Sequence, residues 1–376
     1  MKYLIIMPRY SLPVDGSCGG AVEQLVNSLI VENEKQQGVT FDIITPSFCN
    51  EKYKNTNVYS IKESKLLLAM KRILRKVFKG HKFVSEYYKK AYKIAEKIKP
   101  DRIVFECFYE ANVGKFANLV GKENMFLHKH NCNINETGAQ DCFGNIIAVS
   151  QFLRDGLQEF FKNTSLNIEV LKNCVSNNGF MQPVNETEKY NLRHTLGLKE
   201  DDFVIIYCGR LHPEKGIDKL LLAMKDVVSK HKNAKLLVIG ESFFKNSKPN
   251  KYTKMLTQIA DEIKDNIIFT GFVANKELPK YYQMANLQVI PSICEESAGI
   301  VAMEGAASKI DQIITNSGGL PEYAGRFAMV NKENGLVENL GAEISKSIEG
   351  KLALKESKNE IITKEEYYKK MIDILS

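Results

Sequence analysis

The side chains best suited to chemistry lie in the stretch PSICEESAGIVAMEGAA, residues 291–307. An apolar run at 287–290 predicts a buried strand before this stretch, and a helix is predicted to begin after a short loop. The N–H groups at a helix start have no partner within the helix, so they can bind phosphate oxygens. The residues that would form this anion site are Ser297, Ala298, Gly299 and Ile300.

Two glutamates bracket this helix start. Glu296 lies before the helix and can accept hydrogen bonds from sugar hydroxyls, whereas Glu304 lies within the helix and can hold a ribose diol. Gly299 between them lets a ligand approach the backbone closely. The alternative is a pair of acidic residues beside an ordinary buried helix, and the spacing of the glutamates alone favours that alternative.

A second stretch, YCGRLHPEKG at residues 207–216, changes this balance. A predicted strand at 203–207 runs through Gly209 into a loop that carries Arg210 and Lys215, before a helix predicted over 217–230. Arginine supplies a forked array of donors and lysine a compact charge, and together they suit a diphosphate whose charge grows as it leaves. The alternative is that both cations only cap or solvate a turn.

Four motifs occur in an order that resembles glycosyltransferase family 4, whose members are retaining enzymes with the GT-B fold. They are GRLHPEKG at 209–216, FTGFV at 269–273, a Glu-x7-Glu element in EESAGIVAMEG at 295–305, and GGLPE at 318–322. Each motif alone is weak, but four in order are specific. DGSCGGAVE at 15–23 resembles the glycine loop of the family, and IIAVSQFLRDG at 146–156 resembles its AVS-type strand and helix start.

The resemblance implies a role for each matching residue. Arg210 and Lys215 would stabilise the nucleotide diphosphate, Glu304 would hold the ribose, and Glu296 would bind hydroxyls of the transferred sugar. The backbone groups that would hold phosphate, sugar or base are those of Gly19, Gly20, Gly209, Val273, Ser297, Ala298, Gly299 and Ile300. Ser297-Ala298 departs from the Pro-Phe or Ser-Phe that the family often carries, so the fit of the donor sugar is where this chain is expected to differ.

His128 and His130 lie in MFLHKHN, where the family often places a histidine that faces the donor sugar. The resemblance favours His128 for hydrogen bonding to that sugar, and His130 is the alternative. A lone histidine is more often structural. No residue stands out as a covalent nucleophile. The resemblance implies transfer on one face of the donor, with the leaving phosphate helping to deprotonate the acceptor.

No cofactor and no metal are expected. The sequence has no Asp-x-Asp motif, which agrees with cations and amides replacing a metal ion in stabilising charge. The sequence does not reveal which base the donor carries, because the base would be held by backbone groups. The donor is expected to be a UDP-sugar, with GDP-mannose as the alternative.

Strands that alternate with helical patterns predict an α/β protein with parallel sheets. The resemblance specifies two Rossmann-like domains of the GT-B type facing across a cleft. Their expected bounds are 1–175 on the acceptor side and 186–360 for the nucleotide sugar, with a C-terminal helix over 361–376 that packs back on the first domain. The Asn-rich stretch at 170–189 is expected to cross between the domains.

Composition supports a folded two-domain protein. The chain has 376 residues, of which 44% are hydrophobic and 26% charged, and single cores rarely exceed about 250 residues. The eight cysteines are dispersed without a CxxC pair and are expected to be reduced thiols. The apolar run at 3–7 lacks a cleavage pattern and predicts a first strand, so a cytoplasmic location is expected.

The net charge of +7 is concentrated in one segment. Residues 62–99 contain 13 Lys or Arg and three Glu, a local charge of +10, so the remaining residues sum to −3. Within this segment, KLLLAMKRILRKVFK at 65–79 has one apolar face and many cations elsewhere. Such a helix suits an anionic membrane surface, although packing of the apolar face on the domain core is an equal alternative. No recognised module points to nucleic acid.

The expected function is retaining transfer of a hexosyl unit to a hydroxyl of a saccharide acceptor. A lipid-linked acceptor at the inner face of the cell membrane, in the synthesis of bacterial capsule, exopolysaccharide or lipopolysaccharide, follows from the resemblance and the basic segment. The alternative from another class is a nucleotide-binding or membrane-surface scaffold that has the fold without turnover. Intact Arg210, Lys215, Glu296 and Glu304 argue against that alternative.

Overall fold

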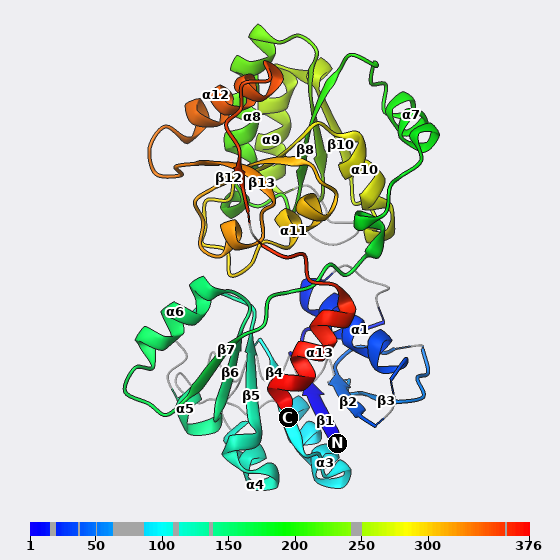
Figure 1. Ribbon diagram of the computed structural model, residues 1–376, viewed down its shortest axis with the longest axis vertical. Helices are drawn as coiled ribbons and strands as arrows, with labels where there is room; N and C mark the ends of the chain where they lie inside the picture. Colours follow the sequence, from blue (N-terminus) through cyan, green and yellow to red (C-terminus); the bar gives the residue numbers. More distant parts are fainter. Residues whose placement is uncertain are drawn as a thin grey trace. The chain divides into compact units, whose positions relative to one another are not determined.

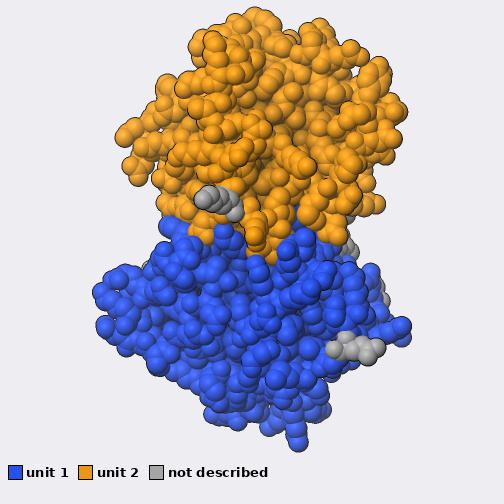
Figure 2. Space-filling model, in the orientation of Figure 1, with its two compact units in different colours: residues 1–176, 363–376 blue, residues 177–362 orange. Residues whose placement is uncertain are grey.

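The structure is a computed structural model that describes residues 1–15, 20–36, 38–49, 51–62, 86–107, 113–134, 138–241, 250–357 and 359–376. It forms two compact units, shown in two colours in Figure 2. Unit 1 comprises Met1–Ser176 together with Thr363–Ser376, and unit 2 comprises Asn177–Ile362. The boundary between the units therefore falls within the Asn-rich stretch at 170–189.

Unit 1 contains a seven-stranded sheet with the order β3-β2-β1-β4-β5-β6-β7, in which all neighbours are parallel. Its strands are β1 (Lys2–Ile6), β2 (Thr40–Thr45), β3 (Thr56–Ser60), β4 (Arg102–Glu106), β5 (Met125–Lys129), β6 (Asn145–Ala148) and β7 (Asn167–Val170). Its α-helices are α1 (Ala21–Asn33), α3 (Glu86–Ile98), α4 (Ala117–Val120), α5 (Ala139–Cys142), α6 (Gln151–Phe160) and α13 (Lys364–Leu375), and short 3-10 turns lie at η1 (Val113–Phe116) and η2 (Lys122–Asn124).

Unit 2 contains a second seven-stranded sheet, with the order β10-β9-β8-β11-β12-β13-β14. Its strands are β8 (Phe203–Cys208), β9 (Ala234–Ile239), β10 (Ile267–Gly271), β11 (Leu287–Ile290), β12 (Asp311–Thr315), β13 (Arg326–Val330) and β14 (Lys355–Glu356), of which β14 is antiparallel to β13. Its α-helices are α7 (Glu186–Thr195), α8 (Ile217–Lys230), α9 (Lys251–Asp261), α10 (Leu278–Met284), α11 (Ile300–Ala307) and α12 (Leu336–Ile348). The 3-10 turns are η3 (Asn178–Met181), η4 (Pro213–Lys215), η5 (Lys264–Asn266), η6 (Asn275–Glu277) and η7 (Leu320–Glu322).

Both sheets are buried between helices, which explains their apolar strands. The side chains of Ile205, Leu236 and Ile313 lie in one core with Leu220 and Met224 of α8, and all five are fully buried. A parallel sheet covered on both faces favours continuous apolar runs over alternation. The apolar runs at 203–207 and 287–290 in the sequence are therefore central strands of this sheet.

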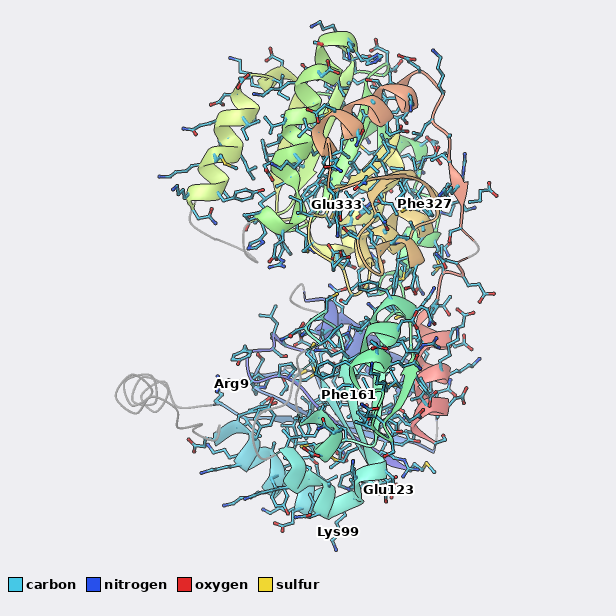
Figure 3. All side chains as sticks on the ribbon, turned by 90° about the vertical axis from the view of Figure 1, so that its left-hand side faces the viewer. Arg9, Lys99, Glu123, Phe161, Phe327 and Glu333 are labelled. Carbon is cyan, nitrogen blue, oxygen red and sulfur yellow. The ribbon has the colours of Figure 1, made fainter. Side chains whose placement is uncertain are left out.

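Each sheet reverses its strand order at one point. In unit 1 the chain passes from β1 outward to β3 and then returns to β4 on the other side of β1; in unit 2 the same reversal separates β8 from β11. Ligands of doubly wound sheets bind at this switch point, outside the carboxyl ends of the strands. In Figure 3, Lys99 and Glu123, which precede β4 and β5, mark the opposite end of unit 1.

The C-terminal helix α13 belongs to unit 1, where it lies beside α1 (Figure 1). Thr363 and Glu366 form a capping box that starts the helix. The buried hydroxyl of Tyr368 donates a hydrogen bond to Asn33 Oδ1 at 3.0 Å, and the ring of Tyr368 meets the ring of Phe41 edge to face. The chain thus returns to its first domain after completing unit 2.

The structure also contains elements that the apolar pattern missed. β3 and β14 are edge strands with few buried side chains, β7 alternates exposed and half-buried residues, and exposed Arg326 and Met329 interrupt β13. Helix α7 begins at Glu186, inside the stretch assigned to a crossing, because Asn185 caps its first turn. Residues 65–79 of the basic segment lie outside the described residues. Of the segment at 62–99, the structure describes residue 62 and residues 86–99, which include α3.

Candidate active site

Two loops meet at the switch point of unit 2. The loop after β8 carries Lys215, the loop after β11 carries Glu296, and Lys215 Nζ donates to Glu296 Oε1 at 2.6 Å. Both side chains are about four-fifths buried, with 23% and 17% of their surface exposed. The structure therefore joins one of the two predicted cations to one of the two predicted glutamates, although 81 residues separate them in the sequence.

The loop after β11 is held by its own hydrogen bonds. Ser292 Oγ donates to the Oε1 atom of Glu296 at 2.6 Å. The backbone carbonyl of Glu296 accepts from Gly319 N at 2.7 Å, which ties the loop to the GGLPE motif. The side chains of Thr315 and Ser317 both donate to the carbonyl of Ser292, at 2.7 and 2.9 Å. These contacts fix the position of the Glu296 carboxylate, and sequence reasoning missed Ser292.

The backbone of Gly216 packs directly against the same loop. Gly216 has φ 67°, and a Cβ atom there would lie 1.9 Å from the carbonyl oxygen of Pro291. The carbonyl of Glu214 accepts from Ile293 N at 2.9 Å and from Cys294 N at 3.2 Å. The two loops are thus interlocked through their backbones, and glycine is required where they approach most closely.

Arg210 and Gly209 follow β8 at the same edge. Gly209 N donates to the carbonyl of Ile239, at the end of β9, at 3.0 Å. The carbonyl of Arg210 accepts from the hydroxyl of Tyr207 at 2.8 Å, while its exposed guanidinium forms no ion pair with any described residue. Arg210 is therefore available to an anionic ligand.

Helix α11 begins after the loop that follows β11, as predicted from the sequence. Its first residue is Ile300, and the N-cap Gly299 makes no side-chain hydrogen bond. Gly299 is buried, and a Cβ atom there would lie 2.7 Å from Leu320 Cδ1. Ser297 and Ala298 lie half-buried in the preceding loop. Two buried side-chain amides bind backbone carbonyls in the first turn of the helix. Gln288 donates to the carbonyl of Val301 at 2.9 Å, and Gln312 donates to the carbonyl of Ala302 at 2.8 Å.

Glu304 lies on α11 in a buried position. Tyr282 OH donates to Glu304 Oε2 at 3.1 Å, and burial raises the pKa of the Glu304 carboxyl to about 7, although the Tyr282 hydrogen bond opposes the shift. Glu304 therefore titrates near neutral pH, which the sequence alone did not indicate. Val273, the residue expected near the base, lies half-buried in the loop after β10.

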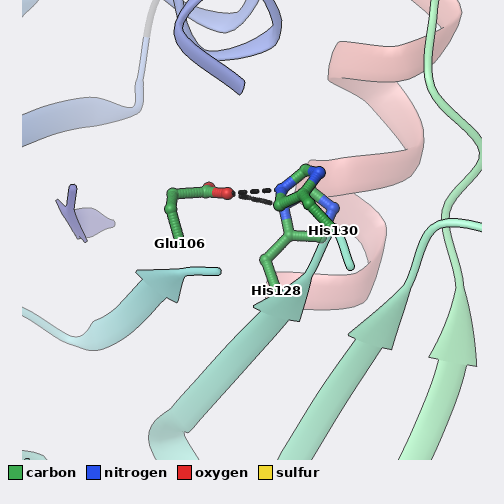
Figure 4. Close-up of side chains that lie close together, drawn as sticks. All are labelled: Glu106, His128 and His130. Carbon is green, nitrogen blue, oxygen red and sulfur yellow. Dashed lines mark hydrogen bonds and ion pairs between the residues drawn. The ribbon is translucent and has the colours of Figure 1, made fainter. Parts of the chain in front are cut away.

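The carboxyl edge of the unit 1 sheet holds a separate cluster of Glu106, His128 and His130 (Figure 4). His128 Nδ1 lies 3.1 Å from Glu106 Oε2, and His130 Nε2 lies 2.7 Å from the same oxygen. The two imidazole rings are 4.0 Å apart between centroids. Glu106 and His128 are each 1% exposed, so the cluster is almost completely removed from solvent.

The cluster has strongly shifted pKa values. Burial would raise the pKa of Glu106, but charge and hydrogen bonds from His128 and His130 outweigh it and lower this pKa to about 2. Burial lowers the pKa of His130 to about 4, assisted by His128 and opposed by Glu106. Glu106 is thus ionised and His130 neutral at neutral pH. The three residues are also metal-ligand types whose ligand atoms lie within 4.8 Å of one another.

The glycine loop of unit 1 is described only in part. Gly19 lies outside the described residues, whereas Gly20 is the N-cap of α1, with its carbonyl accepting from Gln24 N at 2.9 Å. A Cβ atom on Gly20 would lie 2.1 Å from Glu23 Oε2. Glu23 in turn accepts from Leu12 N at 3.0 Å, so Gly20 leaves room for the carboxylate that binds this backbone amide.

Comparison with solved structures identifies the class of fold. The chain is similar to Anabaena HepE, solved in complex with UDP (TM-score 0.69, 16% identity, 100% of this chain and 99% of that chain). It is also similar to WaaG, a glycosyltransferase involved in lipopolysaccharide biosynthesis (TM-score 0.67, 14% identity, 92% and 90% covered). Two α/β units of this kind define the GT-B fold of glycosyltransferases.

The sequence of unit 2 is similar to a family of glycosyltransferases. The family model described as "Glycosyl transferases group 1" matches residues 188–367, so this part of the chain is similar to that family. It is 30% identical over 200 residues to lipopolysaccharide 1,2-N-acetylglucosaminetransferase of Salmonella typhimurium, covering 53% of this chain and 50% of that protein. It is 27% identical over 321 residues to the putative glycosyltransferase YtcC of Bacillus subtilis, covering 82% and 73%.

The matched region spans about half the length of the Salmonella relative. Within the described residues, none of the helices has both the length and the apolar composition to cross a membrane.

Proposed function

We propose that this chain is a retaining glycosyltransferase that moves a hexosyl unit from a nucleotide sugar to a hydroxyl of a saccharide acceptor. The observation that carries the proposal is the meeting of Lys215 and Glu296 at 2.6 Å on the carboxyl edge of the unit 2 sheet. A cation for the diphosphate and a carboxylate for sugar hydroxyls are thereby presented side by side, at the edge where doubly wound sheets bind ligands.

The chemistry follows from the charges on this edge. The bond between the anomeric carbon and the phosphate oxygen breaks, and the bond to the acceptor oxygen forms on the same face of the sugar. Arg210, Lys215 and the amides at the start of α11 stabilise the negative charge on the departing diphosphate, which takes up the acceptor proton. These groups supply the positive charge, so we propose transfer without a metal ion. Activity that EDTA abolishes and magnesium or manganese restores would contradict this.

We propose a UDP-sugar as donor. The support is the likeness to HepE, which was solved with UDP and with UDP-glucose. A thermal-shift panel of UDP, GDP, dTDP and ADP tests the base, because a ligand at 100 times its dissociation constant stabilises a protein by about 2.7 kcal/mol. We expect the largest shift with UDP, and a shift with GDP alone would replace the UDP assignment with GDP-mannose.

The competing function is a scaffold that binds a nucleotide without turnover. Release of free sugar from a nucleotide sugar in the absence of an acceptor separates the two functions. We expect slow release from a UDP-sugar. Binding without release or transfer across a panel of donors and acceptors would favour the scaffold.

We propose a lipid-linked acceptor in the synthesis of a bacterial surface polysaccharide, reached from the cytoplasmic face of the membrane. The support is the basic segment at 62–99, with its charge of +10, which suits anionic lipid headgroups. Flotation with vesicles that contain anionic phosphatidylglycerol tests this. Neutralising Lys71, Arg72, Arg75 and Lys76 together should abolish flotation, and a neutralised variant that floats as well as the parent would exclude the membrane contact.

A further inference from the structure

We propose that Glu106 is a positioning residue: it fixes a proton on Nδ1 of His128 and so leaves Nε2 of His128 to bind a hydroxyl of the sugar substrate. The inference rests on the proposed function, because it names how a sugar is recognised in unit 1. Glu106 lies outside the family motifs, and its position in the sequence indicates no role for it.

The sheet register brings Glu106 and His128 together. Glu106 is the last residue of β4, and His128 of β5 is its direct partner in the parallel pairing of the two strands. Side chains at paired positions of neighbouring strands lie on the same face of the sheet. His130 approaches the same carboxylate from just beyond the end of β5 (Figure 4). The contact is therefore built into the central strands and not into a mobile loop.

The chemistry of a carboxylate fixes the tautomer. An ionised carboxylate can only accept hydrogen bonds, and Glu106 is ionised because its pKa is about 2. His128 Nδ1, at 3.1 Å from Oε2, and His130 Nε2, at 2.7 Å, must therefore both carry protons. A neutral His128 then has its lone pair on Nε2, which makes that atom a hydrogen-bond acceptor.

Nε2 of His128 has no hydrogen-bond partner among the described residues, although it is buried. A buried polar atom without a partner costs about 1–3 kcal/mol, so such an atom calls for an explanation. A hydroxyl donor on a ligand satisfies a bare imidazole nitrogen, whereas a phosphate oxygen, itself an acceptor, does not. The chemistry of the site thus selects the sugar part of a substrate over its phosphates.

A metal ion is the competing occupant of these three residues. Two features favour hydrogen bonding. The candidate ligand atoms already satisfy one another, with His130 Nε2 at 2.7 Å from Glu106 Oε2. Lys129, between His128 and His130 in the sequence, is completely buried. The pKa of His130 is lowered by burial first, then by His128, and also by the charge of Lys129. A divalent cation would add charge beside that buried ammonium.

The tautomer is tested by nitrogen NMR of the full chain labelled with 15N-histidine, with the His128 signals assigned by their loss in H128N. We expect the Nδ1–H tautomer for His128 in the parent and a mixture of tautomers in E106Q, whose neutral amide no longer demands a proton on Nδ1. E32Q is the matched control, because Glu32 is also a buried carboxylate of unit 1, paired with Lys35 at 2.7 Å. Nε2–H in the parent, or E106Q spectra equal to those of the parent, would overturn the proposal.

Substrate binding is tested by a pair of variants at His128. Asn places its amide near the Nδ1 position and Gln near the Nε2 position, so H128N retains the contact with Glu106 whereas H128Q retains a polar group toward the ligand. We expect H128N and E106Q to lower kcat/KM for sugar release from UDP-glucose by about tenfold or more, the size of one lost hydrogen bond to a charged or strongly polarised group. H128Q should lose less, and the dissociation constant of UDP should stay within about twofold in all three. Equal losses in H128N and H128Q would overturn the role of Nε2.

The two proposals fail separately. A parent that releases no sugar from any nucleotide sugar removes the proposed function, while the NMR result still decides the role of Glu106. Addition of UDP-glucose should shift the Nε2 signal of His128, and no shift at saturating UDP-glucose would overturn the hydroxyl contact. Binding of one Zn²⁺ per parent chain that E106Q abolishes would overturn the hydrogen-bonded cluster in favour of a metal site.

Discussion

Lys215 Nζ and Glu296 Oε1 lie 2.6 Å apart and connect the loops that follow β8 and β11. These two strands are neighbours in the sheet and flank the point where its strand order reverses. The ion pair therefore lies where a ligand of this fold is expected, and a bound diphosphate has to compete with Glu296 for the lysine.

E296Q tests this competition. Removing the carboxylate frees Lys215 and removes a repulsive charge near the phosphates, so we expect UDP to bind E296Q at least as tightly as it binds the parent. Sugar release should fall, because an amide accepts fewer hydrogen bonds from sugar hydroxyls than a carboxylate does. Calorimetry with UDP and a sugar-release assay give the two values. Weaker binding of UDP together with unchanged release would contradict the assigned roles.

The buried carboxyl of Glu304 predicts a pH dependence of stability. Its pKa is raised from 4.5 to about 7 in the folded chain, chiefly by burial. Between these values the unfolded chain has lost the proton and the folded chain retains it, so the free energy of unfolding falls as pH rises. The full difference is about 3 kcal/mol, at about 1.4 kcal/mol for each pKa unit.

E304Q removes this titration and keeps an acceptor for Tyr282. Urea unfolding of the parent and E304Q from pH 4.5 to 8 should show the advantage of E304Q growing up to about pH 7 and then levelling off. Two curves that stay parallel over this range would show that Glu304 is not the titrating group. UDP binding should also release protons near pH 6.5, because a ribose diol favours the ionised carboxylate.

Alanine substitutions at Gly216 and Gly197 distinguish the cost of backbone strain from the cost of a steric clash. Both have left-handed backbones, with φ 67° and 69°, but a Cβ on Gly216 would lie 1.9 Å from Pro291 O, whereas a Cβ on Gly197 meets nothing within 4 Å. We expect G197A to cost about 1 kcal/mol from strain alone and G216A to cost at least about 2 kcal/mol more. G216A should also weaken UDP binding, since the clash moves the loop of Lys215. Equal losses of stability would contradict the interlocked loops.

The central elements could be predicted from the sequence because they are buried. The apolar run at 287–290 coincides with β11, the run at 203–207 with all but the last residue of β8, and the helical pattern at 217–230 with α8. Edge strands such as β7 were not predicted, because their side chains are largely exposed and form no apolar run. The motif order also led to the correct fold class, and the family model for group 1 glycosyl transferases matches residues 188–367.

Side-chain contacts that depend on which strands pair in the sheet could not be predicted from the sequence. Glu106 and His128 are 22 residues apart in the sequence and become partners only through the pairing of β4 and β5. Tyr282 reaches Glu304 from α10 in the same way, across 22 residues. Spacing along the chain identified His128 and Glu304 as candidates, but their partners and the raised pKa of Glu304 required the packed structure.

The most direct measurement of the central claim is the affinity of UDP for K215A. The matched control is K225A, which removes another unit 2 lysine paired with a carboxylate: Lys225 of α8 lies 2.5 Å from Glu262, which directly follows α9. One lost hydrogen bond to a charged phosphate costs about 1.5–3 kcal/mol, or roughly 10- to 150-fold in the dissociation constant. We predict this loss for K215A, with K225A like the parent. Equal affinity for UDP in K215A and the parent would contradict a diphosphate site at the edge of the unit 2 sheet.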